Sequence, residues 1–400
     1  MREDALNHLT RLTVEIDDRS VGSPGNQKAA DYVREVMSGH GWTTEQQKFD
    51  ALDWEDGAAQ LVADDGNSFD VFAGPYSQGC NVHAPLVPIA NLAELERAQL
   101  SGTHILLHGG ITQTPLMPKN FPFYTDEAQQ KIIAALERSG AETVLCATDT
   151  PPMIEDGDFT VPSVFMSAAE GARLTSFAGQ QLHLTSHCRR IPSSAANIVG
   201  LMNDRTKKRL VVTAHLDAKK GVPGALDNGT GVTTLLLLAK LLDDYDGPYC
   251  IELVALNGED HYAVPGQVAY LAANPDLADN VVLNINIDGV GYIEGDTAYS
   301  FFELSDDLEH IAETELLARP GLCEGIQWPQ GDHSMFVQSG CPAIAVSSNW
   351  LLENMATQAV THSQLDQMTL VDPDKLVRNV LALTSFIETV GQFCHQPTVS

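Results

Sequence analysis

Histidine and carboxylate side chains recur in the second half of the chain wherever an apolar, strand-like run ends. The set comprises His215, Asp217, Asp227, Glu259, Asp260, Asp288 and His362. Imidazole nitrogen and carboxylate oxygen together suit Zn²⁺ or a similar divalent ion. A carboxylate that closes an apolar strand, as Asp288 does, is costly to bury unless it is paired or metal-bound. Two histidines and three carboxylates are enough for two cations if one carboxylate bridges them, and such a pair can hold a water and a substrate oxygen together.

The stretch 210–242 indicates how these side chains are positioned, because it reads as strand, loop and helix in that order. The apolar, β-branched run 210–213 predicts a buried parallel strand. A Gly/Pro-rich loop at 221–224 then leads to Asp227, and from residue 230 apolar residues recur at helical spacing. Open α/β folds keep their sites at the carboxyl ends of parallel strands, so we expect the polar set to gather there.

The pattern after residue 194 alternates strands with helices. Strands are predicted at 210–213, 249–256, 281–287 and 343–346, and helices near 230–245, 266–273, 305–318 and 373–390. This predicts an α/β fold, a three-layer sandwich whose mostly parallel central sheet is flanked by helices. The segment 57–190 is richer in prolines and short strands, which predicts a smaller β-rich inserted domain. The predicted domains are therefore 1–56 with 191–400, and 57–190.

The 400-residue chain is strongly acidic, with 53 Asp and Glu against 23 Lys and Arg. Such a surface repels phosphate backbones and anionic lipid, so neither nucleic acid nor a membrane is an expected partner. No apolar run reaches membrane-spanning length, and the acidic start does not resemble a signal peptide. The expected location is cytoplasmic, or secreted or periplasmic if a leader has been trimmed. Seven single cysteines favour reduced thiols over disulfides or a thiolate zinc site.

Several short motifs together resemble family M twenty-eight of peptidase clan MH, the co-catalytic zinc aminopeptidases that include aminopeptidase Y and relatives of glutamate carboxypeptidase II. The matching runs are 215–217 (HLD), 223–232 (PGALDNGTGV), 257–260 (NGED), 286–288 (NID), 331–336 (GDHSMF) and 361–366 (THSQLD). Residues 21–26 and 194–200 fit as well. The resemblance covers most of residues 1–56 and 190–400, and its strength lies in the joint occurrence of the motifs in this order. The segment between is similar to the protease-associated domain inserted in many members, which implies a lid or substrate wall.

The resemblance implies a metal-binding role for the five residues that match the ligand positions. His215 and Asp288 would bind one zinc ion, and Asp260 and His362 would bind the second. Asp227 would bridge the two. Asp260 stands where many relatives have a second Glu, and its side chain is shorter by a methylene. The implied cofactor is therefore a pair of zinc ions, with Co²⁺ or Mn²⁺ as substitutes.

The resemblance also implies roles for residues that surround the metals. Glu259 would be the general base, and Asp217 would orient His215 and fix its tautomer. Asp366 would support the site near His362. Asp332 and His333 are candidates for substrate or supporting contacts, although a buried hydrogen-bonded pair is the plainer interpretation of these two.

The implied reaction is removal of N-terminal residues from peptides that have a free N-terminus. Two other activities fit the same scaffold: a carboxypeptidase or dipeptidase, with Lys219 and Lys220 supplying positive charge, and a glutaminyl-cyclase-like enzyme. A non-catalytic binding protein on a peptidase fold is the alternative from another class. In such a protein we would expect one or more metal ligands, or Glu259, to be replaced. The sequence predicts neither side-chain preference nor oligomeric state.

Overall fold

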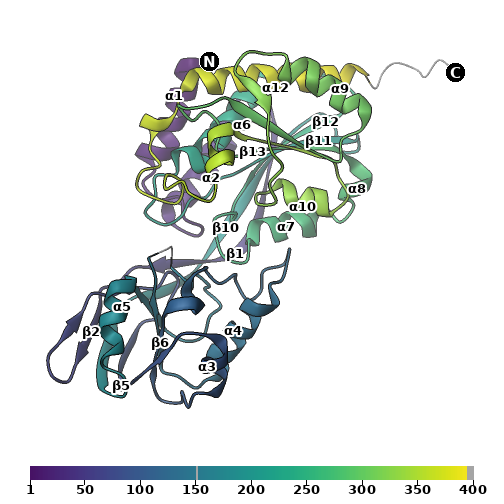
Figure 1. The fold of residues 1–400 in the computed structure, drawn as a ribbon. Coiled ribbons are helices and arrows are strands. Elements are labelled where there is room, and N and C mark those ends of the chain that lie inside the picture. The colour runs from purple at the N-terminus through teal and green to yellow at the C-terminus, as the bar shows by residue number, and fades with distance from the viewer. Residues whose placement is uncertain (150–151, 394–400) are drawn as a thin grey trace. The chain divides into compact units, whose positions relative to one another are not determined.

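The computed structural model describes residues 1–149 and 152–393. Residue contacts divide the chain into two compact units: unit 1 consists of residues 1–51 and those from 194 onward, and unit 2 consists of residues 52–193. Figure 1 colours the chain by residue number, so that unit 2 is dark blue to teal. That unit 2 is a protease-associated domain stays a prediction.

Unit 1 is built on a mixed sheet of eight strands in the order β1-β10-β12-β11-β13-β16-β14-β15. The strands are β1 (Thr43–Glu55), β10 (Arg189–Met202), β11 (Arg209–His215), β12 (Cys250–Leu256), β13 (Val281–Ile287), β14 (Thr297–Phe302), β15 (Leu322–Glu324) and β16 (Ala343–Ser348). The central strands β12, β11, β13 and β16 are mutually parallel. Strand β10 pairs with β12 at one edge of this block, and β14 pairs with β16 at the other edge. Both pairings are antiparallel. The predicted α/β fold with a mostly parallel central sheet is confirmed, and the sheet extends further than predicted.

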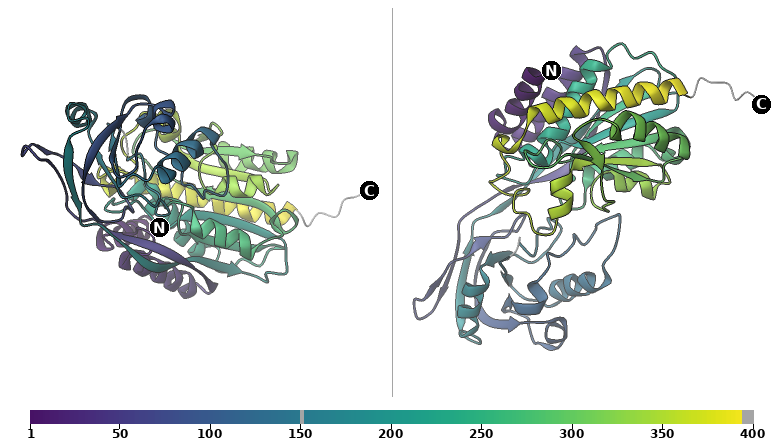
Figure 2. Two further views of the ribbon diagram at one scale, coloured as in Figure 1. Left: turned by 90° about the horizontal axis from the view of Figure 1, so that it is seen from below. Right: turned by 45° about the horizontal axis from the view of Figure 1, so that its top comes forward.

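Helices flank this sheet. They are α1 (Arg2–Thr10), η1 (Arg11–Glu15), α2 (Pro24–Gly39), η3 (Ala225–Gly229), α6 (Thr230–Leu241), α7 (Pro265–Ala273), α8 (Leu277–Asn280), α9 (Asp306–Ala312), η4 (Glu313–Leu317), α10 (His333–Gln338), α11 (Asn349–Asn354), η5 (Met368–Leu370) and α12 (Pro373–Phe393). Figure 2 shows α12, in yellow, beside the purple N-terminal helices, and α1, α6 and α12 contact one another. None of the helices in the described ranges is long and apolar enough to cross a membrane.

The two faces of the sheet have different chemistry because side chains alternate along each strand. On the face toward α6, the parallel strands contribute Leu210, Val212 and Ala214 and their neighbours to the main hydrophobic core. The opposite face contains buried polar groups, among them Thr213 and Glu252. Glu252 accepts a hydrogen bond from Tyr270 Oη of α7, 2.8 Å away, which places α7 on that second face.

Unit 2 has its own mixed sheet of eight strands, in the order β3-β2-β9-β5-β6-β7-β8-β4. The strands are β2 (Ala59–Ala63), β3 (Ser68–Phe69), β4 (Phe72–Ala73), β5 (Cys80–Ile89), β6 (His104–Leu107), β7 (Thr143–Ala147), β8 (Ser163–Met166) and β9 (Gln181–Ser186), and the helices are α3 (Leu92–Arg97), η2 (Gly109–Thr112), α4 (Glu127–Arg138) and α5 (Ala168–Thr175). Separate apolar clusters fill the two sides of this sheet. The six described cysteines of the whole chain are free thiols, and Cys394 lies outside the described residues.

Candidate metal centre

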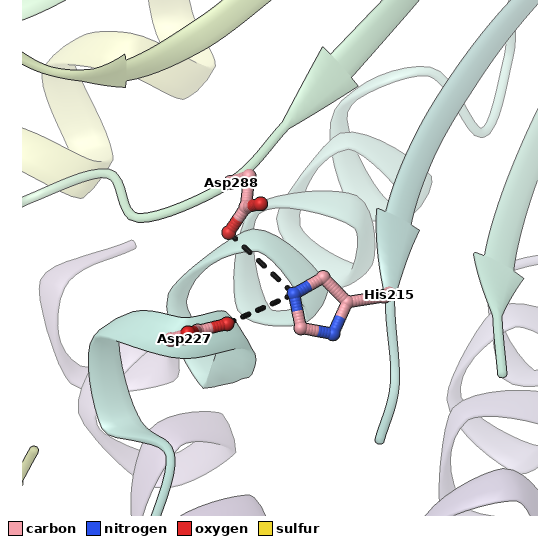
Figure 3. A group of neighbouring side chains, drawn as sticks. All are labelled: His215, Asp227 and Asp288. Atoms are coloured by element: carbon pink, nitrogen blue, oxygen red, sulfur yellow. Dashed lines mark ion pairs between the residues drawn. The ribbon is translucent and has the colours of Figure 1, made fainter. Parts of the chain in front are cut away.

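The carboxyl ends of the parallel strands bring three of the predicted ligands together. His215 is the last residue of β11, Asp288 directly follows β13, and Asp227 lies in the short turn η3 that precedes α6. His215 Nε2 is 3.0 Å from Asp227 Oδ1 and 3.5 Å from Asp288 Oδ1. Figure 3 shows both carboxylates directed at the same ring nitrogen. The three ligand atoms lie within 4.8 Å of one another, which is compatible with one cation between them.

A second triad shares Asp227 with the first. His362 Nε2 is 3.0 Å from the other oxygen of Asp227, Oδ2, and 2.9 Å from Asp260 Oδ1. These atoms again lie within 4.8 Å of one another. Asp260 follows β12, whereas His362 lies in the loop before α12 and its side chain is 52% exposed. The five predicted ligands thus form two adjoining groups, with a separate Asp227 oxygen in each.

The donor set fits divalent cations. His215 Nδ1 lies 3.1 Å from the backbone oxygen of Asp217, which can only accept, so Nδ1 carries the proton. In the neutral ring, Nε2 then presents a lone pair to two carboxylates. It is buried and has no hydrogen-bond partner among the described residues. Burial opposes charge on the ring, yet Asp288, Asp217 and Asp227 raise the pKa of His215 well above its usual value. The position therefore favours a cation, either a proton or a metal ion.

Asp217 holds the loop that follows β12. Its Oδ1 accepts hydrogen bonds from the backbone N–H groups of Gly258, 2.7 Å away, and Glu259, 3.2 Å away, and its Oδ2 accepts one from Asp260 at 3.1 Å. The same carboxylate lies 3.8 Å from His215 Nδ1. The side chain therefore positions the Glu259–Asp260 loop as well as facing the His215 ring. The backbone oxygen of Asp217 is the closer contact of that ring.

Asp366 fixes the segment that contains Asp227. Its two carboxylate oxygens accept hydrogen bonds from the N–H groups of Leu226, at 2.6 Å, and Asp227, at 3.0 Å. Burial raises the pKa of Asp366 to about 6. Its contacts lie on the backbone at Asp227, the ligand that both triads share, and a supporting role for Asp366 stays a prediction.

Glu259 lines a cavity of about 450 Å³ together with Asp227, Asp260, Asp288 and His362. Burial, with Asp260 and Asp288 adding to it, raises the pKa of Glu259 well above its usual value, although His215 opposes the shift. In the described part of the chain, neither ligand triad includes the Glu259 carboxylate. The carboxyl group of Glu259 therefore lines the cavity beside the candidate metal ligands without belonging to either triad.

The other wall of the cavity is largely apolar. Trp328 contributes to it, and so do Leu351 and Leu352 of α11 and Met355 just after it. Trp328, Leu351 and Leu352 are buried, and Met355 is partly exposed. Sequence reasoning did not single out these side chains, because only the folded chain brings the short helix α11 next to the metal ligands.

Asp332 and His333 are both buried, but they do not pair with each other. Asp332 Oδ1 accepts a hydrogen bond from Gln267 Nε2 at 2.6 Å, and burial raises the pKa of Asp332 to about 7. His333 Nε2 is 2.9 Å from the backbone oxygen of Trp328, and its ring packs against Trp328 and Phe302. Neither is among the described residues that line the cavity. Asp332 Oδ2 and His333 Nδ1 are buried and have no hydrogen-bond partner among the described residues, and a supporting role for these two residues stays a prediction.

Sequence reasoning also missed Arg19, which is 2% exposed and donates to four backbone oxygens in and around the site. Its only local signal is a single basic residue in an otherwise acidic run, Asp17-Asp18-Arg19. Such a run is typical of a solvated loop, so nothing nearby in the sequence indicates that the guanidinium is buried.

Comparison with known proteins agrees with this geometry. Residues 197–387 match the model of Peptidase family M28. The probable lipoprotein aminopeptidase LpqL of Mycobacterium tuberculosis is 26% identical over 308 residues, which are 71% of this chain and 58% of that protein. The chain therefore spans less than two thirds of the length of that relative.

Two solved structures share the fold. An aminopeptidase from Aneurinibacillus sp. strain AM-1 matches with a TM-score of 0.76 at 18% identity, over 97% of this chain and 93% of that one. BSAP, a zinc aminopeptidase from Bacillus subtilis, matches with a TM-score of 0.74 at 18% identity, over 97% of this chain and 94% of that one. The matched segment 197–387 contains both ligand triads, and the chain therefore includes a Peptidase family M28 domain.

Proposed function

We propose that this chain is a dizinc aminopeptidase that removes N-terminal residues from peptides. One observation supports it above the others: two His-and-carboxylate triads meet at Asp227, and each uses a different oxygen of that residue. His215 and Asp288 would hold one cation, and Asp260 and His362 would hold the other. A carboxylate shared between the two triads would keep both cations near the same substrate atom.

Two bound zinc ions would supply Lewis-acid chemistry, lowering the pKa of a water and polarising the scissile carbonyl. Glu259 takes the proton from the attacking water and returns it to the leaving amine. Both transfers need a carboxylate that lies beside the metal ligands without being one. Asp217 positions Glu259 through its backbone N–H, and Asp366 positions Asp227 in the same way.

The cavity indicates the kind of residue that is removed. The apolar side chains of Trp328, Leu351 and Leu352 line it on one part of its surface, together with Lys219 and the carboxylates of the metal ligands. An apolar side chain gains free energy when it packs on this wall, whereas a charged carboxylate would lose its hydration against it. We therefore expect a leucyl substrate to be hydrolysed faster than an aspartyl one.

The test is a panel of aminoacyl reporters, with free and with N-acetylated α-amines, assayed in Zn²⁺, Co²⁺ or Mn²⁺ and again after chelation. An aminopeptidase hydrolyses the free-amine leucyl reporter, loses that activity with chelator and recovers it on readdition of metal. Equal hydrolysis of the acetylated peptide would favour a carboxypeptidase or dipeptidase, and a pyroglutamyl product would favour a glutaminyl cyclase. A folded protein that binds none of these metals would instead be a binding protein on a peptidase fold.

A further inference from the structure

Arg19 is a buried guanidinium whose hydrogen-bond partners are all backbone oxygens of other segments. Arg19 Nε donates to Leu216 O at 3.0 Å. Nη1 donates to Leu12 O at 2.7 Å and to Pro223 O at 3.0 Å, and Nη2 donates to Gly224 O at 2.8 Å. A guanidinium has five N–H groups in a rigid plane, so one side chain can join several segments at fixed spacing.

Two of the joined segments contain metal ligands of the first triad. Leu216 lies between His215, at the end of β11, and Asp217. Gly224 is the residue before η3, the turn in which Asp227 lies. Arg19 therefore connects the backbone beside His215 to the backbone leading into Asp227. Because the donors are charged and the acceptors are buried, each of these bonds is stronger than a neutral hydrogen bond in water.

The approach is so close that only glycine fits at position 224. Gly224 has φ +59°, and a Cβ built on it would lie 2.8 Å from Arg19 Nη2, 2.7 Å from Ala218 Cβ and 2.6 Å from Asp227 O. The turn into Asp227 thus rests directly on the guanidinium. Any change in the position of Arg19 changes the support of this turn.

Leu12 O belongs to η1, the turn that ends the N-terminal helical segment. Carbonyls in the last turn of a helix lack intrahelical partners, and a basic side chain can satisfy them. Arg19 therefore also caps this segment, whose helix α1 packs on α6 and α12. The N-terminal part of the chain is in this way tied to the metal-ligand turns.

We propose that Arg19 is a positioning residue that sets the separation of His215 and Asp227 and thereby the affinity of the first triad for a divalent cation. This inference rests on the proposed dizinc function. Lysine keeps the charge at this position but presents a single nitrogen, which cannot reach four oxygens spread around a planar fork. Partners that hold metal ligands in place without touching the metal contribute about 10- to 100-fold to metal affinity.

Arg209 provides a matched control. It is also buried, with 3% of its surface exposed, and it begins β11, the strand that His215 ends. Six residues of strand separate the two positions, which is about 20 Å. Arg209 Nη1 contacts Glu252 Oε2 at 2.9 Å and Asn274 Oδ1 at 2.7 Å, away from both triads.

The experiment compares wild type, Arg19→Lys, Arg19→Gln and Arg209→Lys as full chains. Zn²⁺ affinity is measured by competition with a chromogenic chelator, Co²⁺ coordination by the visible spectrum, and stability by thermal unfolding of the metal-free proteins. We expect both Arg19 variants to bind Zn²⁺ about 10- to 100-fold more weakly at one of the two sites. The Co²⁺ spectrum should change as well. Arg209→Lys should lower the unfolding temperature and leave Zn²⁺ affinity unchanged to within about twofold.

Three results would overturn the inference. The first is an Arg19 variant that folds and binds Zn²⁺ like wild type with the same Co²⁺ spectrum. The second is a loss of Zn²⁺ affinity in Arg209→Lys equal to that in Arg19→Lys. The third is failure of both Arg19 variants to fold while Arg209→Lys folds, since Arg19 would then serve the stability of the whole unit. Wild type that binds no Zn²⁺ would refute the proposed function itself, which separates that failure from the three above.

Discussion

The two ends of β11 both contain buried charge, but only one end is balanced by the chain itself. At the start of the strand, Arg209 pairs with Glu252, and Tyr270 Oη donates to the second oxygen of Glu252. At the far end, His215 Nε2 faces Asp227 Oδ1 at 3.0 Å and Asp288 Oδ1 at 3.5 Å. Structural and functional charges in a buried site therefore differ in how the charge is balanced. A self-contained pair compensates the charge that the fold buries, whereas an excess of carboxylates around a nitrogen lone pair makes a site for added cations.

The largest expected effect comes from changing Glu259 at the unbalanced end. Glu259→Gln keeps the shape of the side chain but removes its capacity to accept a proton. We expect hydrolysis of a leucyl reporter to fall by about 10²- to 10⁴-fold with zinc content unchanged. Glu309→Gln, at an exposed position in α9, is the control and should retain activity. Near wild-type turnover in Glu259→Gln would mean that another group is the base.

The balanced end should respond in stability rather than in activity. Glu252→Gln leaves the Arg209 charge buried without its carboxylate partner. Breaking a buried ion pair by removing one partner costs about 3–5 kcal/mol, so chemical denaturation should show a loss of that size. The zinc affinity of the folded fraction should be unchanged. A variant as stable as wild type would show that the pair at this end contributes nothing to folding.

Asp217→Asn tests how the loop after β12 is held at the metal end. The carboxylate accepts from three backbone N–H groups, of Gly258, Glu259 and Asp260. An amide has one oxygen, so at least one of these N–H groups loses its partner and the loop shifts. We expect zinc affinity or turnover to fall about 10- to 100-fold, as measured by chelator competition and reporter assay. Unchanged values for both would exclude Asp217 as a support of this loop.

The smallest effect should come from the exposed pair of His83 and Asp64 in unit 2. The two side chains are 2.8 Å apart but more than half exposed, so solvent screens them. His83→Ala should change the free energy of unfolding by less than about 1 kcal/mol and leave zinc binding as it was. If zinc affinity changed in this variant, the exposed His83–Asp64 pair would also influence metal binding. The contrast between exposed pairs and the buried ligand triads would then fail.

Much of the framework could be predicted because its signals are local. The apolar run 281–287 coincides with β13, and the helical spacing after residue 230 predicted α6, although the helix ends at Leu241 rather than at 245. His215 and Asp288 could be chosen because they end or directly follow such a run, whereas Asp227 and His362 lie in loops further along the chain. The grouping of these ligands into two triads was implied by resemblance alone, since spacing in sequence does not show which strand ends are neighbours.

The supports of the site could not be predicted, because they act through the backbone across long sequence separations. Arg19 reaches Leu216, and Asp366 reaches Asp227, without any local pattern that marks the contact. Almost every residue has a backbone oxygen and an N–H group, so the type of the partner residue does not reveal the contact. The positions of Leu351 and Leu352 in the cavity wall could not be predicted either, because they depend on the turn after β16.

The most direct test of the central claim is zinc stoichiometry, measured by elemental analysis after dialysis against Zn²⁺. We expect two equivalents in wild type and one in either Asp288→Ala or His362→Ala, because each variant removes a ligand from one triad only. Asp227→Ala, which removes the shared ligand, should retain less than either. A wild-type chain that holds at most one equivalent, or variants of both triads that still hold two, would contradict the central claim.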